Sequence, residues 1–208
     1  MAGHDRITPD GKRFFKQIAE LKKLQARAGF TAGKSGRNKD HKTVVAEDYK
    51  NKKGQTVATV ADIAMWNELG TARSPPRPFL RQSVDNNTGQ IKAMCAAQLN
   101  AIAKGTATAK DALQALGAMQ VGLIQKTIRD GDFVENKPST IRAKINRNQK
   151  LKKSLTAEEI KNNRKNDRTI TRGKNKGKVI AGGTISKPLI DTGRMRQSVH
   201  YVIEEKGG

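Results

Sequence analysis

Two neighbouring runs carry the clearest structural signal in this chain: Ala64-Met65-Trp66-Asn67-Glu68-Leu69-Gly70-Thr71 and, after three further residues, Pro75-Pro76-Arg77-Pro78-Phe79-Leu80. They hold the only tryptophan, three of the six prolines and one of the five phenylalanines of the chain. The pattern predicts a short apolar helix that stops at Gly70, a rigid proline turn, and a new start at Phe79. No nucleophile, second acid or histidine lies nearby, so we interpret the stretch as a packing and docking motif.

The polar residues of this motif have expected roles. Asn67 and Glu68 should end the helix and hydrogen-bond to the turn or to Arg77. Pro76 and Pro78 fix the backbone on both sides of Arg77, so its side chain loses little entropy when it finds a partner. Arg77 is therefore predicted to make an interface contact, and its replacement by alanine to leave the fold intact.

The chain is strongly basic and poor in apolar residues. Its 208 residues suit one domain with an extension, or two small domains. Hydrophobic residues make up 35% and aromatic residues 4%, so part of the chain should contribute little to a core. The net charge of +22 attracts polyanions, and nucleic acid or an acidic protein surface is the expected partner. A basic surface that only aids solubility is the simpler alternative.

No cofactor and no metal are expected. Cys95 is the only cysteine, which excludes an intrachain disulfide, and His4, His41 and His200 lack the spacing of metal ligands. The first residues lack the apolar run of a signal peptide, and no stretch approaches the ~20 apolar residues that cross a membrane. We expect a protein made in a cytoplasm and used there, or built into a particle assembled there.

Local patterns predict an α+β fold, with a small antiparallel sheet packed by several helices and a basic extended arm or insertion. Thr8-Pro9 opens a helix whose apolar stripe reaches about Ala28, and Gly29 ends it. β-branched runs between residues 29 and 60 predict an antiparallel meander. The helices expected after it are residues 61–69, residues 79–104 with a break near 86–89, and residues 108–129.

The chain divides into three parts: an α+β core over 1–135, a basic arm or insertion over 136–178, and C-terminal strands over 179–208 that complete the core. The arm carries fifteen Lys and Arg against three acids, a net charge of +12. Such an arm can grip phosphates without reading sequence. Its candidate contacts to DNA or to an acidic partner are Lys150, Lys152, Lys153, Arg164, Lys165, Arg168, Arg172, Lys174 and Lys176.

Two motifs invite a catalytic interpretation. Ala28–Ser35 fits a relaxed phosphate-binding loop, but a helix is expected before it where a strand is needed, and a polar turn after it. Leu189-Ile190-Asp191-Thr192-Gly193 matches the triplet of aspartic proteases, which need a second aspartate and far more chain. The simpler interpretation is that Asp191 or Thr192 caps a helix starting near Arg194, and that Gly193 permits the turn.

The stretch around Trp66 and Arg77, together with the C-terminal stretch from Pro188 to Val202, resembles the phage neck and tail-completion proteins, also called virion morphogenesis proteins. Trp66-Asn67-Glu68-Leu69-Gly70-Thr71 with Pro76-Arg77-Pro78-Phe79-Leu80 resembles their central signature, although Pro75 departs from it. Pro188–Gly193 with Ser198-Val199-His200-Tyr201-Val202 resembles their closing motif. The resemblance covers residues 55–85 and 185–203 well, and the helices between them less well. Residues 146–178 match nothing in the family.

The resemblance implies a non-enzymatic virion protein at the head–tail junction. It implies a ring of six copies around the DNA path, in contact with head-closure or connector proteins and with tail-terminator or tail-tube proteins. The alternative is a basic nucleic-acid-binding protein that acts without a ring. The residues assigned to the interface or structural motif are Trp66, Asn67, Glu68, Gly70, Arg77, Pro78, Phe79, Asp191, Thr192 and Gly193.

Overall fold

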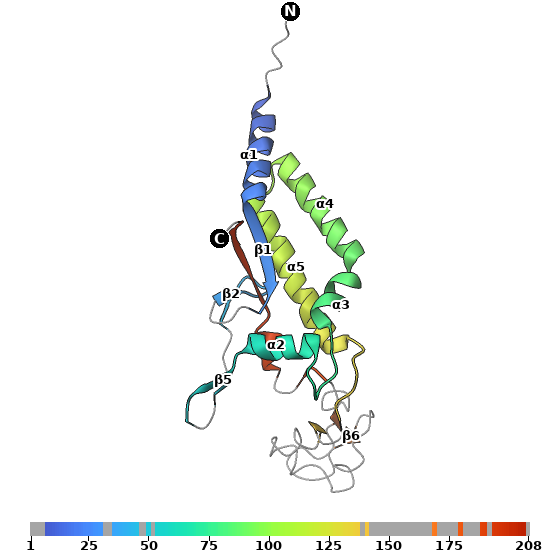
Figure 1. Cartoon of the computed structure of the whole chain (residues 1–208). Helices are drawn as coiled ribbons and strands as arrows, with labels where there is room; N and C mark the ends of the chain where they lie inside the picture. The colour runs from blue at the N-terminus through green and yellow to red at the C-terminus, as the bar shows by residue number, and fades with distance from the viewer. Residues whose placement is uncertain are drawn as a thin grey trace, which may run out of the picture.

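The α+β class is confirmed by the computed structural model, in which a long helix packs against a small antiparallel sheet (Figure 1). The structure describes residues 7–30, 35–45, 49–50, 53–137, 140–141, 168–169, 179–180, 188–190 and 193–206. The long helix is α5 (Ala109–Asp130), and the other helices of the body gather around it. Their bounds are α1 (Pro9–Lys23), α2 (Val60–Leu69), α3 (Phe79–Asp85), α4 (Thr88–Lys104) and α10 (Arg194–Gln197).

The main sheet joins segments from both ends of the described chain. Its strand order is β1 (Leu24–Gly29), β8 (His200–Glu205), β2 (Ser35–Arg37) and β3 (Thr43–Val45). β1 and β8 pair antiparallel along their whole length, from Leu24 opposite Glu205 to Gly29 opposite His200. β8, one of the two inner strands, is thus distant in sequence from both of its neighbours.

The predicted extent of the first helix is wrong. Thr8 caps it as expected, with its hydroxyl oxygen accepting from the Gly11 amide, but the helix ends at Lys23. Residues 24–29 are strand β1 because their backbone groups pair with β8, and Arg27 forms a 2.8 Å ion pair with Glu204. A complete ladder with a distant strand outweighs the local helical pattern.

The predicted meander and C-terminal strands are divided among three sheets. β2 and β3 join the main sheet, whereas β4 (Tyr49–Lys50) and β5 (Thr56–Ala58) form a separate two-stranded sheet. β7 (Val179–Ile180) does not join β8 as expected but pairs with β6 (Arg168–Thr169). Of the two C-terminal strands that the structure describes, β7 and β8, it is β8 that enters the main sheet.

The predicted helix boundaries after residue 59 are close to those observed, and local caps set the starts of α2 and α5. Thr59 and Asp62 form a capping box at the start of α2, and Thr108 and Asp111 form another at the start of α5. The threonine amide and hydroxyl hydrogen bonds lower the pKa of both aspartates. Their stabilising contribution is therefore present above the ordinary aspartate pKa and is lost as pH falls through the lowered values. The expected break near 86–89 separates α3 from α4.

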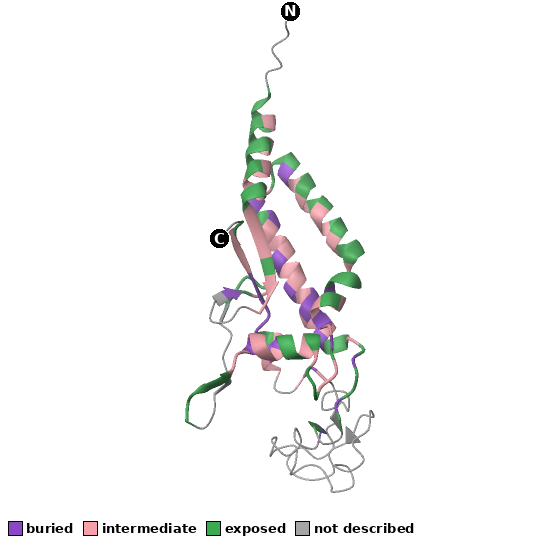
Figure 2. Cartoon of the chain, in the orientation of Figure 1, coloured by how far each residue is buried: buried purple, intermediate pink, exposed green. Residues whose placement is uncertain are grey.

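The core brings both motifs together. Buried residues line α5 in Figure 2, and they form one cluster with α2, α3 and the C-terminal segment. From α2 and the start of α3, which carry the first motif, come Val60, Ala64 and Phe79. The cluster members from the C-terminal motif are Leu189, Met195, Val199 and Tyr201. Two segments more than a hundred residues apart are thus halves of one packed unit.

Two glycines of α5 should respond oppositely to alanine. A Cβ on Gly117 would lie 2.5 Å from the ring of the buried Tyr201, whereas a Cβ on Gly122 would meet nothing within 4 Å. We expect Gly117→Ala to lower the free energy of unfolding by about 1–3 kcal/mol through overpacking. Gly122→Ala should raise it by about 0.5–1 kcal/mol, because alanine favours the helix. Urea denaturation measures both, and equal effects would contradict the close packing of Tyr201 on α5.

Candidate docking site

The first motif is α2, a tight loop and the start of α3. Gly70 ends α2 with φ of 79°, and a Cβ there would lie 2.8 Å from the Pro76 nitrogen. Thr71 and Ser74 exchange backbone hydrogen bonds of 2.9 and 3.2 Å, which close the loop. Only glycine combines this backbone conformation with so close an approach of the chain.

Asn67 and Glu68 fasten α2 to the chain that follows the loop. The Asn67 carbonyl accepts a 2.7 Å hydrogen bond from the Arg77 amide, and its side-chain amide donates to the Ile63 carbonyl. The two carboxylate oxygens of Glu68 accept from the amides of Leu80 and Arg81 at 2.8 and 3.0 Å. Glu68 therefore caps the N-terminus of α3, where a negative charge is favoured.

Arg77 is an internal clamp, and the prediction that it makes an interface contact is wrong. The residue is 5% exposed. Its Nε donates to the Val134 carbonyl at 2.9 Å, and its Nη2 donates to the Asn136 side-chain oxygen at 3.3 Å. Burial lowers the pKa of the guanidinium, which nevertheless remains charged at neutral pH. The prolines order Arg77 for a partner within the same chain, namely the segment that follows α5.

Pro78 and Phe79 also have structural roles, at the start of α3 and in the core. Pro78 is the N-cap residue of α3 and has no side-chain group to cap it, which explains the use of Glu68. Phe79 is completely buried in the core cluster, and its ring meets that of Phe30 edge to face at 6.0 Å. The turn therefore inserts an aromatic anchor into the core.

The outward side of α2 is apolar and exposed. Met65, Trp66 and Leu69 lie at helical spacing on the side of α2 away from the buried Val60 and Ala64. Trp66 is 45% exposed and Leu69 72%. We call these three residues the α2 outer face, and the exposed C-terminal part of α2 is visible in Figure 2. Clustered apolar side chains with a tryptophan are typical of protein-binding surfaces.

A hollow adjoins this face. It has a volume of about 470 Å³ and is bordered by Leu69, the loop as far as Pro76, and Lys137. The sequence singled out Trp66 but missed Met65 and Leu69. Their spacing relative to Trp66 could have indicated a shared face, but only the fold shows that this face is uncovered.

The second motif is described in part. Gly193, with φ of 77°, is the N-cap residue of α10, and its left-handed backbone permits the turn as predicted. Asp191 and Thr192 lie outside the described residues. Met195 is buried, and the Arg196 carbonyl accepts from the Gln125 side chain of α5 at 3.2 Å. The described part of this motif serves packing.

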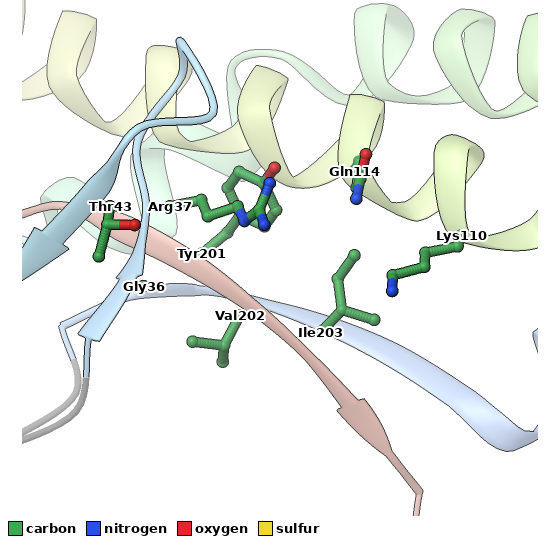
Figure 3. A pocket seen from close by; sticks show the side chains of 8 residues that line it. All are labelled: Gly36, Arg37, Thr43, Lys110, Gln114, Tyr201, Val202 and Ile203. Carbon is green, nitrogen blue, oxygen red and sulfur yellow. The ribbon is translucent and has the colours of Figure 1, made fainter.

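A second hollow, of about 270 Å³, lies between the sheet and α5 (Figure 3). Arg37 and Lys110 reach it from β2 and α5, with Gln114 and Tyr201 between them. The Tyr201 hydroxyl lies 2.6 Å from Nδ1 of His41. Burial raises the pKa of Tyr201, partly offset by Arg37, so the hydroxyl stays protonated at neutral pH. The pair fastens the β2–β3 hairpin to β8.

The candidate contacts of the basic arm lie outside the described residues, except Arg168, whose backbone begins β6. In the described ranges no cluster of His, Cys, Asp and Glu could hold a metal ion. No described helix combines the length and apolar character of a membrane span. The stretch that fits a relaxed phosphate-binding loop follows strand β1, which ends at Gly29, and not the helix expected there. Ser35 begins strand β2, whereas a phosphate-binding loop needs a helix at that end.

Similarity to known proteins adds nothing to this geometry. No protein-family model, no curated protein and no solved structure matches the chain. Inferences about function therefore rest on the two motifs and on the surfaces of the fold.

Proposed function

We propose that this chain is a structural virion protein of a tailed phage, a neck or tail-completion component at the head–tail junction. It forms a homo-oligomeric ring around the DNA path and binds head-closure and tail-terminator proteins, without catalysis. The resemblance of the two motifs supports the proposal. Their packing into one core unit is consistent with it, because a shared signature then describes one structural module.

The single observation that carries the docking role is the α2 outer face. Met65, Trp66 and Leu69 are exposed, while the same helix is held from behind by Glu68 and by buried Val60 and Ala64. A fixed apolar surface loses little entropy on binding, so it suits a permanent assembly.

A joining assay tests the proposal. Trp66→Ser should reduce the yield of infectious particles from separate heads and tails by about 100-fold, because a buried interface tryptophan contributes roughly 2–4 kcal/mol. The thermal midpoint should remain within about 2 °C, since Trp66 contributes little to the monomer core. Val84→Ser is the matched control, because Val84 is equally exposed but lies on α3. Normal joining with Trp66→Ser would refute the docking role.

The charge of +22 favours the second candidate, a nucleic-acid-binding protein that acts without a ring. Salt-titrated DNA binding separates the two functions. Tight binding with a steep salt dependence, together with no assembly on heads or tails, would favour the second candidate. Weak, shallow binding together with assembly on heads or tails supports the virion role.

A further inference from the structure

We infer that copies of this chain associate head to tail, with the exposed face of α1 in one copy packed on the α2 outer face of the next. This inference rests on the proposed function, for which it names the two halves of the ring interface. It starts from a second exposed apolar surface, which the docking site does not use.

Helix α1 is incompletely covered by the rest of the chain. All of it is described, and no residue in it is buried. It is held at one side, where Gln17 accepts from the Ala109 amide at 2.6 Å. Phe15 is 59% exposed, with Ala19 exposed one turn further on. A helix of this length is marginal in water unless its apolar side is packed, so α1 gains from a further partner.

The two surfaces cannot meet within one copy. α1 lies beside the start of α5, whereas α2 lies near its other end (Figure 1). Two different patches at opposite ends of a subunit generate a heterologous interface, which closes into a ring when the rotation between copies allows it.

Charge distinguishes this pairing from a symmetric one. Exposed Lys12 and Lys16 lie within one turn of Phe15, and α1 carries five Lys and Arg against two acids, a net charge of +3. Two α1 faces would therefore repel each other. In contrast, α2 contains no basic residue, and Asp62 in its first turn contributes a negative charge, whereas the carboxylate of Glu68 is bonded to the start of α3. A second copy thus offers α1 an apolar surface of the opposite charge.

The surroundings of α2 limit where α1 can lie. Arg73 and Lys137 border the hollow beside Leu69. Lysines of α1 placed over that hollow would meet cations, so the pairing places α1 along α2 itself. There, a lysine beside Phe15 can also approach the face of Trp66, an arrangement that favours a cation.

A mixing experiment tests the arrangement. In sedimentation velocity, the wild-type chain should form an oligomer, and Phe15→Ser and Trp66→Ser should each be monomeric, with association at least about 100-fold weaker. Phe15→Ser keeps an intact α2 face, and Trp66→Ser keeps an intact α1 face. An equimolar mixture should therefore form a one-to-one heterodimer and nothing larger. Val84→Ser should assemble like the wild type.

Several outcomes would overturn the inference: a monomeric wild type, an oligomeric single variant, or a mixture that remains monomeric. Failure of the inference is distinguishable from failure of the proposed function. If Trp66→Ser abolishes head–tail joining but the mixture stays monomeric, the α2 face binds another virion protein. If the heterodimer forms but joining is normal with Trp66→Ser, self-association stands and the proposed function fails.

Discussion

Arg77→Ala should lower the free energy of unfolding by about 3 kcal/mol. The substitution removes a buried guanidinium together with its hydrogen bonds to the Val134 carbonyl and to Asn136. Removing one side of a buried charged network costs about 3–5 kcal/mol where no other group replaces it, and water that fills the vacated space recovers part of this. Chemical denaturation followed by circular dichroism gives the value.

The control for this prediction is Arg81→Ala. The Arg81 side chain is exposed, and the backbone amide that donates to Glu68 is retained in alanine. It should change stability by less than about 0.5 kcal/mol. Arg77→Lys should fall between wild type and alanine, since an ammonium retains the charge but not the fork of donors. An Arg77→Ala chain as stable as the wild type would return Arg77 to the docking role predicted from sequence.

Phe79→Ala should be more damaging, at about 4 kcal/mol, or a thermal midpoint lower by about 10 °C. Phe79 has no exposed surface, and its removal leaves a cavity where α2, α3 and the C-terminal segment meet. Phe30 loses its edge-to-face partner as well.

Phe15→Ala is the matched control for Phe79, because it deletes the same ring from an exposed site. At a dilution where the wild type is monomeric, it should cost less than about 0.5 kcal/mol. Equal losses at the two positions would mean that the core is not centred on Phe79. Differential scanning fluorimetry at two protein concentrations separates this effect from any loss of self-association.

Local signals in the sequence predicted the elements whose ends are set by near neighbours. Thr59 and Thr108 bond to groups three residues away, and Gly70 ends α2 with a positive φ next to the turn that follows it. Capping boxes and terminal glycines have the same residue spacing in one helix as in another, so a sequence pattern identifies them. The α+β class followed from the same kind of information.

Features that depend on distant partners were missed or assigned wrongly. Strand β1 exists because of β8, which lies about 170 residues later. The role of Arg77 depends on residues 134–136, and no local pattern places these residues beside the proline turn. Likewise, the composition of α2 predicted a packing and docking motif, but only the packed structure separates its buried side from its exposed side.

The central position of β8 has a consequence for the order of events during synthesis. β8 leaves the ribosome after every other described element, yet it lies between β1 and β2 and supplies the buried Tyr201. A nascent chain can form its helices early, but the sheet cannot close until residues 200–205 emerge. Translation therefore controls when the sheet can form, and a chain cut short before β8 lacks the strand that joins β1 to β2.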